Sequence, residues 1–407
     1  MNTPLNRCVL TASLCLLAPL PAQALEFSGY VRSGVGNSLN GGKQSCFKLP
    51  GAETKYRLGN ECEQYAELEL RQDILTLDDG SVLSVDGMAS FYNQYNHQLT
   101  FQGENGSVRV PQLYAQWSNL PRLNGGSLWA GRRYYKRNDI HISDFYYWNQ
   151  SATGGGIEDV LIGGLKYSYA FSRKDSLYQE QAVTRHDVNV AGFKTNPGGE
   201  LEFGVSYLEK PRRTDAHSGW AITAQHVQNA FLGGRNTVAL QYGEGSGTGL
   251  GYTGNTRLDN SSKRYRLVEF FDWQVTPRFG GQVEAVYQKD VRPQGGNQEW
   301  LSLGVRPAYA ISQQFKLVTE LGHDQVKAAD GTRTLSKFTF APTWSPKGPG
   351  FWERPEIRLY YTYARWNKAA QLAANRLDAG SALSDSGAFG RARHGSNMGL
   401  QVEYWWK

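Results

Sequence analysis

Long apolar runs are missing from this chain of 407 residues. Mean hydropathy is −0.52, and beyond residue 24 no segment approaches the roughly 20 consecutive apolar residues that a membrane-spanning helix needs. This excludes a helical membrane protein. Charge of one sign is also scarce, because 43 basic residues face 37 acidic ones and the net charge is only +6. No basic block is interleaved with aromatic residues, so nothing in the sequence indicates a nucleic-acid partner.

Catalytic and metal-binding patterns are equally scarce. The seven histidines and four cysteines are scattered, so neither a metal site nor a cofactor is predicted. A barrel hydrolase would need a nucleophile activated by a neighbouring base. His141 lies close to Ser143 and Asp144, but sequence neighbours on one loop seldom form a triad. We therefore predict that the protein is not an enzyme, whereas esterase or phospholipase activity of the purified protein would favour the opposite interpretation.

The N-terminal segment has the features of an export signal. Arg7 precedes the short apolar stretch Cys8 to Leu20, and Ala22-Gln23-Ala24 forms a small-residue cleavage site. The apolar stretch is too short to span a membrane as a helix. We predict that residues 1–24 are a signal peptide and that residues 25–407 form one exported domain, because the remainder has no linker and no repeat longer than a hairpin.

Cysteine is rare after removal of the signal peptide, because Cys8 and Cys15 lie within it. Cys46 and Cys62 then remain as an even pair in an exported protein, for which a disulfide is the expected state. Such a bond would hold the first long connection as a compact flap on the outer rim of the fold.

Tyrosine, tryptophan and glycine are abundant, with 23, 11 and 46 residues. They accompany short segments in which apolar and polar residues alternate, a pattern typical of barrel strands that carry apolar residues on one face only. Tight turn sequences separate these segments at 77–80, 120–126, 163–164, 196–199, 232–236, 276–278, 312–314 and 345–348. Long polar connections alternate with the turns, at 36–61, 93–107, 136–158, 173–184, 210–217, 244–262, 289–297, 325–333 and 367–395.

Nine long connections and eight tight turns require eighteen strands. The least obvious turn is Gly163-Gly164, which divides the run from Val160 to Phe171 into two strands. Without this turn, the long connections before and after it would lie on opposite sides of the membrane. The alternation therefore predicts an all-β fold, a transmembrane up-and-down antiparallel β-barrel.

Strand alternation separates residues that face the lumen from residues that face lipid. Tyr30 and Arg32 fall on the polar face of the first strand, and Tyr65 and Glu67 on that of the second. Trp405 falls on the polar face of the last strand. Aromatic rings are unusual in a polar lumen, so these positions call for a functional explanation. For Trp405, at a strand end, a place in the interfacial aromatic girdle is the alternative.

The third long connection is rich in aromatic residues between positions 132 and 148 and is poorly suited to an exposed loop. We predict that it folds into the barrel and narrows it, bringing Arg137, Asp139, Asp144 and Tyr146 to the channel axis. Arginine forks and carboxylates can replace water around sugar hydroxyls, and flat rings pack against the apolar faces of pyranose rings. Weak binding at successive sites suits transport through a pore. The alternative is a general diffusion porin whose constriction carries charges only for ion selectivity.

Several stretches are long enough to be hard to meet by chance, namely FSGYVRSGVG, CFKLPGAETKYRLGNECEQYAE, LWAGRRYYKRNDIHISDFYYWN, NPGGELEFGVSY, WERPEIRLYYTYARW and the ending QVEYWW. They resemble maltoporin, a family of trimeric eighteen-stranded maltodextrin channels of bacterial outer membranes, over essentially the whole mature chain. The resemblance implies export through the periplasm to the outer membrane, contact with its lipid, and assembly as a homotrimer. It also implies passive, selective diffusion of maltose and maltodextrins, with another oligosaccharide or a glucoside as the alternative cargo.

The resemblance further implies a track of aromatic rings, which corresponds here to Tyr30, Tyr65, Phe101, Trp344 and Trp405. Phe101 stands where the family has a tryptophan contributed by the second loop of a neighbouring subunit. Trp344 shares the strand parity of lipid-facing residues, but Pro342 can reset that parity. Ile222 occupies the remaining position of the track, where the expected ring is missing.

The polar track of the family corresponds to Arg32, Arg57, Glu67, Arg109, Arg137, Asp139 and Asp144, with Tyr146 as the constriction ring. Sucrose-type relatives replace key positions of the third loop, so Arg137, Asp139 and Tyr146 favour maltodextrins over sucrose. Two departures from the family pattern are shorter outer loops and the terminal Lys407, which stands in place of an aromatic assembly signal. Outer-loop partners such as phages are therefore not predicted.

Overall fold

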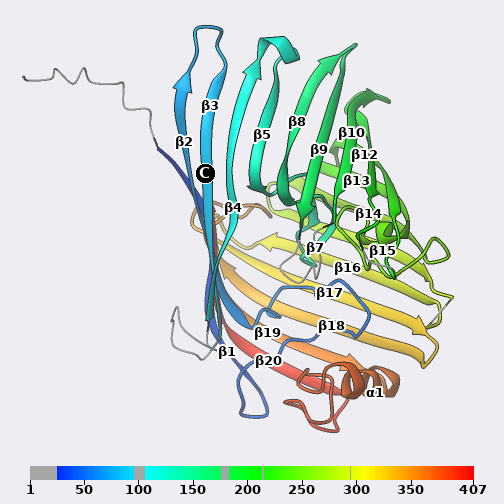
Figure 1. The fold of residues 1–407 in the computed structure, drawn as a ribbon. Helices are drawn as coiled ribbons and strands as arrows, with labels where there is room; N and C mark the ends of the chain where they lie inside the picture. Colours follow the sequence, from blue (N-terminus) through cyan, green and yellow to red (C-terminus); the bar gives the residue numbers. More distant parts are fainter. Residues whose placement is uncertain (1–24, 96–105, 176–182, 213–214, 294) are drawn as a thin grey trace, which may run out of the picture.

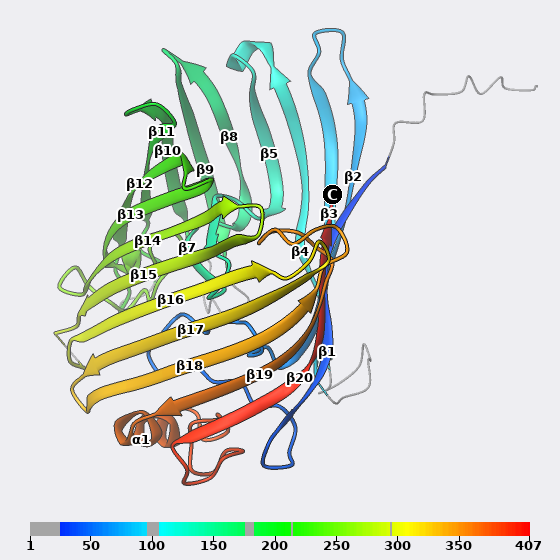
Figure 2. The ribbon, with the colours of Figure 1, turned by 180° about the vertical axis from the view of Figure 1, so that it is seen from behind.

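The computed structural model describes residues 25–95, 106–175, 183–212, 215–293 and 295–407. Within these residues, eighteen strands form one antiparallel sheet. The sheet closes into a barrel because β1 (Glu26–Ser38) pairs with both β2 (Glu63–Thr76) and β20 (His394–Trp406) (Figure 1; Figure 2). This confirms the predicted fold class. In the same residues, no helix combines the length and apolar character needed to cross a membrane. The predicted signal peptide lies outside the described residues.

The other barrel strands follow one another in chain order: β3 (Val82–Gln94), β4 (Gly106–Leu120), β5 (Gly126–Arg133), β8 (Ala152–Ile162), β9 (Leu165–Lys174), β10 (Arg185–Lys194), β11 (Gly199–Leu208), β12 (Gly219–Phe231), β13 (Gly234–Gly245), β14 (Lys263–Thr276), β15 (Phe279–Val291), β16 (Gln298–Ala310), β17 (Phe315–Ala328), β18 (Gly331–Trp344) and β19 (Glu356–Trp366). A separate hairpin consists of β6 (Arg137–Ile140) and β7 (Phe145–Asn149). Short helical segments are η2 (Pro121–Leu123), η3 (Ser246–Gly249) and α1 (Lys368–Leu377).

Side-chain alternation gives the barrel wall two distinct faces. Along β19, buried Arg358 alternates with Leu359, which is 60% exposed. Successive residues of a strand point to opposite faces, so the apolar set faces outward and the polar set lines or fills the lumen. The parity expected for the first strand agrees with this arrangement, because Phe27 is exposed and Arg32 is buried.

The turn at Gly163-Gly164 divides β8 from β9 as predicted. Both glycines have positive φ angles, 59° and 83°, which residues with a Cβ rarely adopt. Two other connections differ from the prediction. The long connection expected at 325–333 is a two-residue turn, because β17 and β18 stay paired up to Ala328 and Gly331. The tight turn expected at 345–348 is a longer segment, residues 345–355.

The first loop, residues 39–62, begins with the exposed segment 39–43 at the barrel end, and its remainder runs inside the barrel across the inner faces of β17 and β18 (Figure 1). Phe47, Leu49 and Leu58 are at most 1% exposed, and the backbone N–H of Leu58 donates to the Glu320 carboxylate of β17 over 3.1 Å. The predicted rim flap is therefore wrong, because burial of these apolar side chains against the inner wall stabilises the inward position.

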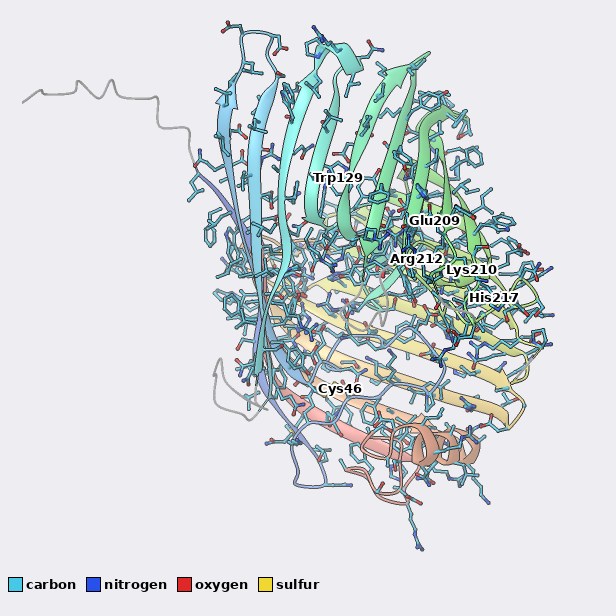
Figure 3. The ribbon with its side chains drawn as sticks, in the orientation of Figure 1. Cys46, Trp129, Glu209, Lys210, Arg212 and His217 are labelled. Atoms are coloured by element: carbon cyan, nitrogen blue, oxygen red, sulfur yellow. A yellow bond between two sulfur atoms is a disulfide. The ribbon has the colours of Figure 1, made fainter. Side chains whose placement is uncertain are left out.

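The predicted disulfide between Cys46 and Cys62 is confirmed, with the two Cα atoms 5.9 Å apart. Cys46 is labelled in Figure 3, on the segment that crosses the barrel interior. The bond closes the part of the first loop that includes Lys55 and Arg57. Closing a loop covalently removes conformational freedom from its unfolded state, so the bond favours the arrangement that holds these two cations in the lumen.

The third loop, residues 134–151, folds into the barrel as predicted. Ile140 and Ile142 at its hairpin are fully buried. The Phe145 ring packs edge-on against Trp300 of β16 at 5.3 Å, and the Arg306 guanidinium donates to the Ile142 carbonyl oxygen over 3.1 Å. An apolar, hydrogen-bonded base thus fixes this loop to one side of the wall, and its polar side chains face the space that remains.

Candidate functional site

A central cavity of about 870 Å³ lies between the third loop and the wall formed by β20, β1, β2 and β3. It is lined by Tyr30, Arg32, Arg57, Glu63, Tyr65, Glu67, Tyr92, Arg137, Asp139, His141, Asp144, Tyr146, Trp405 and Lys407. A second cavity of about 370 Å³ adjoins it, because Asp139, His141 and Trp405 line both. The two cavities form a path along the inner wall.

Four aromatic rings, here called the aromatic strip, follow this path. Tyr65 on β2 lies 6.1 Å from Tyr30 on β1, and Tyr30 lies 6.4 Å from Trp405 on β20, in a nearly parallel orientation of 15°. Trp352, from the segment 345–355, continues the series 6.5 Å from Trp405. Sheet register explains the first steps, since Tyr30 is the direct partner of Trp405 in the pairing of β1 with β20.

Arg137 belongs to the third loop and lines the side of the cavity that faces the aromatic strip. Its guanidinium lies 4.0 Å from the ring centre of Tyr134 and 4.1 Å from that of Tyr146, so the fork is held between two ring faces. This contact keeps a planar group with several N–H donors in a fixed orientation. The ring of Tyr146 is in turn held beside the cavity that it narrows.

Two carboxylates of the third loop differ in their surroundings. Enclosure by the barrel raises the pKa of Asp139, although Arg137 opposes this shift. Desolvation acts in the same direction on Asp144, but Lys55 at 3.0 Å, together with Arg57, outweighs it and lowers the pKa of Asp144. Asp144 is therefore a paired carboxylate, whereas Asp139 presents the more weakly compensated oxygens to the cavity.

Arg57 connects the first loop to the aromatic strip. Its guanidinium donates to the Tyr30 hydroxyl over 2.7 Å and to Glu61 over 2.8 Å, and lies 3.2 Å from Glu403 of β20. Arg32 pairs with the same Glu61 at 2.6 Å. Buried charges require such partners, and the network fixes the position of the Tyr30 ring.

His141 lies where the aromatic and polar sides meet. Its ring is perpendicular to that of Trp405 at 5.8 Å, and its two nitrogens lie 3.4 Å from Arg57 and from Arg354. Burial and the neighbouring Arg57 hold the pKa of His141 well below its ordinary value, so the imidazole is neutral. Ser143 donates to Glu284 over 2.5 Å instead. The sequence neighbours of His141 thus have other partners, and no triad forms among them.

The cavity brings together ten residues that the sequence analysis named: Tyr30, Tyr65, Trp405, Arg32, Arg57, Glu67, Arg137, Asp139, Asp144 and Tyr146. Arg109 pairs with inward-facing Ser90 in the register of β3 with β4 but does not line the cavity. Phe101 lies outside the described residues. Trp352, His141, Glu63 and Tyr92 were not predicted.

Trp344 does not belong to the strip. It pairs with Phe315 and Ile357, and all three are exposed on the outer face of the wall. Pro342 stands opposite Leu317 in an unbroken register, so it does not reset the parity. The predicted position of Trp344 is therefore wrong.

Ile222 likewise lies on the outer face, opposite Val205 and Tyr242, and is 39% exposed. It does not mark a lost ring of the lumen, so the expectation of a missing ring at this position is also wrong.

The closed barrel with a loop folded into its lumen has the architecture of a multi-pass outer-membrane channel protein. The structure is similar to the outer membrane protein OpdK of Pseudomonas aeruginosa, with a TM-score of 0.52 and 10% identity over 94% of this chain and 99% of that one. It is also similar to OccK9 (OpdG) of the same organism, with a TM-score of 0.51 and 12% identity over 94% and 98% of the two chains. These likenesses concern the fold alone.

A family model described as LamB porin matches residues 25–406. The chain therefore belongs to the LamB porin family, which confirms the family resemblance found in the sequence. Because porins are channels of the outer membrane, membership confirms the predicted location and the prediction that the protein is a channel and not an enzyme.

Proposed function

We propose that the protein is a sugar-selective channel through which maltose and maltodextrins diffuse passively. The observation that carries this proposal is the aromatic strip, with rings at successive separations of 6.1, 6.4 and 6.5 Å along one side of the lumen. Hydrogen-bonding groups of the third loop face it across the central cavity.

The strip provides apolar surface of the kind that sugars recognise. One face of a pyranose ring carries mainly C–H groups, which pack against flat aromatic rings. Because neighbouring rings of the strip are close together, a sugar can contact the next ring before it leaves the previous one. Binding is then shared over several weak sites, and this allows both capture and release.

The polar side provides the matching hydrogen bonds. Arg137 offers donors, Asp139 offers acceptors, and the hydroxyl of Tyr146 can do both. A sugar that leaves water exchanges its hydration for these groups, which lowers the free-energy cost of desolvating it. Diffusion along the strip down a concentration gradient requires no further energy source.

The direct test is titration of sugars against single-channel ion current. We expect maltotriose to block the current at lower concentration than maltose, because a longer chain contacts more of the strip, and sucrose and glucose to block weakly. Equal, weak block by all four sugars would favour a general diffusion porin. Tighter block by another oligosaccharide or a glucoside would identify a different cargo for the same path.

Assembly as a homotrimer is a second proposal, and it rests on the family resemblance. The second-loop segment 93–107, which could reach over a neighbouring subunit, contains residues outside the described part of the chain. We expect native mass spectrometry in mild detergent to give three times the mass of one chain. A monomeric mass with full sugar block retained would contradict this proposal.

A further inference from the structure

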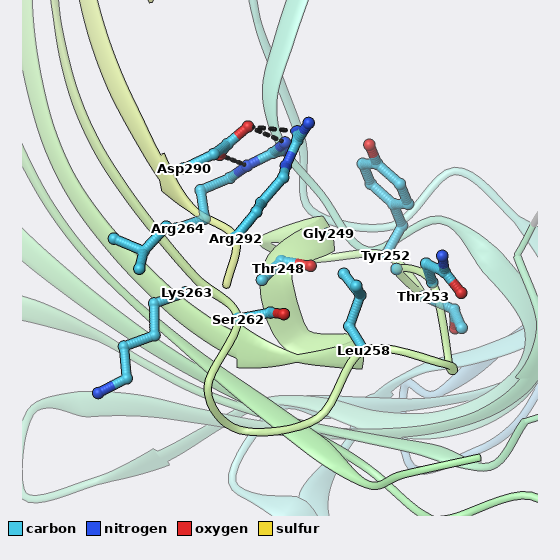
Figure 4. A pocket seen from close by; sticks show the side chains of 13 residues that line it. Thr248, Gly249, Tyr252, Thr253, Leu258, Ser262, Lys263, Arg264, Asp290 and Arg292 are labelled. Carbon is cyan, nitrogen blue, oxygen red and sulfur yellow. Dashed lines mark hydrogen bonds and ion pairs between the residues drawn. The ribbon is translucent and has the colours of Figure 1, made fainter. Parts of the chain in front are cut away.

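A separate pocket of about 440 Å³ lies between the loop 246–262 and the adjoining ends of β14 and β15. It is lined by Tyr252, Thr253 and Asn255 of the loop together with Arg264, Asp290 and Arg292 (Figure 4). None of these residues belongs to the central cavity. The volume lies within the range of small-molecule sites in proteins.

The pocket combines fixed donors and acceptors with an aromatic ring. Buried Asp290 accepts from Arg264 over 2.7 and 3.1 Å and from Arg292 over 2.6 Å. Figure 4 shows both guanidinium groups converging on this carboxylate. The ring of Tyr252 is 41% exposed beside them, and hydroxyl and amide side chains of the loop complete the lining.

Charge pairing in the pocket fits a neutral ligand. Arg264 also pairs with Glu53 at 3.2 Å, and Glu53 is shared with Arg266 at 2.9 Å. The three guanidinium groups of Arg264, Arg266 and Arg292 therefore outnumber the two carboxylates, but each of them already has a carboxylate partner. The amine of Lys263 points away from this group in Figure 4. An anion would displace existing ion pairs, whereas sugar hydroxyls can accept from guanidinium edges and donate to carboxylate oxygens without doing so.

Two residues of the pocket, Arg264 and Asp290, lie on the lumen side of the barrel wall. Arg264 and Asp290 are direct partners on the inner face, next to Tyr265, which is 43% exposed on the outer face. The loop 246–262 packs closely against the third loop. A Cβ atom placed on Gly251 would lie only 3.0 Å from the Asn149 carbonyl oxygen. The backbone N–H of Thr253 also donates to Asp175. These contacts hold the loop inward.

The first loop joins the pocket to the central cavity. Glu53 contacts Arg264 of the pocket, Lys55 pairs with Asp144 of the cavity at 3.0 Å, and Arg57 lines the cavity. Four residues of even a fully extended chain span at most about 14 Å. The Cα atoms of Glu53 and Arg57, whose side chains contact the pocket residue Arg264 and line the central cavity, are therefore at most this far apart, a separation that a short oligosaccharide can span.

We propose that this pocket is an outer docking site for longer maltodextrins, which holds one end of the chain while the other reaches the aromatic strip. The proposal rests on the proposed function of the channel. In this proposal the pocket captures sugar. Its effect is therefore confined to chains long enough to reach both sites, and to sugar that arrives from the loop side, the side of the membrane on which the long connections such as 246–262 lie.

The test is analysis of current noise in planar bilayers with sugar added to one side at a time. Tyr252→Ala and Arg292→Ala are compared with Arg257→Ala, which removes a cation from the same loop outside the pocket, where its guanidinium lies 3.3 Å from Asp215. We expect the association rate of maltoheptaose from the loop side to fall about threefold to tenfold in the first two variants. Maltose from either side and maltoheptaose from the turn side should bind as in the wild type.

The outcomes separate the docking site from the channel function. Wild-type block by maltodextrins with no change in the two pocket variants, or the same change in Arg257→Ala, overturns the docking site alone. A loss that is equal for maltose and for both sides of the membrane also overturns it, because it indicates a general disturbance of the lumen. Absence of maltodextrin block in the wild type overturns the channel proposal and the docking site together.

Discussion

Replacing Trp405 with alanine is expected to weaken maltotriose block about tenfold, the effect of losing roughly 1.4 kcal/mol of binding free energy. Trp405 lies between Tyr30 at 6.4 Å and Trp352 at 6.5 Å, so its loss interrupts the strip in the middle. Ion conductance should stay equal or rise, because a ring leaves the lumen and no charge changes. Titration of maltotriose against single-channel current measures both quantities.

The control for this variant is Trp344→Ala. Trp344 is also a tryptophan at a strand end, but it is 38% exposed on the outer face of the wall. We expect its removal to leave sugar block and conductance unchanged. Equal weakening of block by both replacements would mean that the effect comes from barrel stability, and the assignment of Trp405 to the sugar path would be wrong.

Replacing Arg137 with alanine is expected to weaken sugar block and also to shift the channel toward cations. The change removes a fork of donors fixed between Tyr134 and Tyr146. It also removes the positive charge that partly compensates Asp139. Block and reversal potential, measured on the same membrane in a salt gradient, report the two effects separately.

The shift toward cations should depend on pH. Enclosure already raises the pKa of Asp139 while Arg137 opposes that shift, so the pKa of Asp139 rises further without the arginine. The cation preference is present where Asp139 is ionised, above that pKa, and is lost as the pH falls through it. Arg137→Lys keeps the charge but not the fork, and should retain ion selectivity while sugar block weakens. A selectivity shift in the lysine variant as large as in the alanine variant would contradict this account.

Much of the barrel could be predicted from the sequence because turn chemistry and alternation are local properties. Gly163-Gly164 marks a turn, since few other residues adopt two successive positive φ angles. The incorrect predictions of connections lie where local sequence signals are weak. Polar residues around Ala329 and Asp330 form the ends of two paired strands instead of a long loop, because polar composition alone does not distinguish a loop from an inward-facing strand face.

The candidate site was partly predictable for the same reason. Strand parity alone indicated Tyr30, Tyr65 and Trp405, which line the central cavity. Parity also predicts that Trp344 faces lipid, and the structure agrees with parity and not with the position implied by the family resemblance. Trp352 could not be assigned by parity, because it lies in the irregular segment 345–355. The aromatic pair Phe351-Trp352 beside turn-forming glycine and proline was the available signal.

The inward course of the first loop could not be predicted from local patterns. It depends on long-range contacts, such as the hydrogen bond from Leu58 to Glu320 and the ion pair of Arg57 with Glu403. The clue in the sequence was apolar Phe47, Leu49 and Leu58 in a connection that would otherwise be exposed, because a solvent-exposed flap would leave these side chains in water.

The central claim, one sugar path with an aromatic and a polar side, is tested most directly by measuring maltotriose block and reversal potential together in Tyr65→Ala, Trp405→Ala, Tyr146→Ala and Arg137→Ala. For Tyr65→Ala and Trp405→Ala, the account predicts weaker block with ion selectivity unchanged. For Tyr146→Ala, it predicts higher conductance because the constriction widens. For Arg137→Ala, it predicts weaker block together with a shift toward cations. Unchanged block in all four variants, with altered ion selectivity, would contradict the sugar path and identify a general diffusion porin.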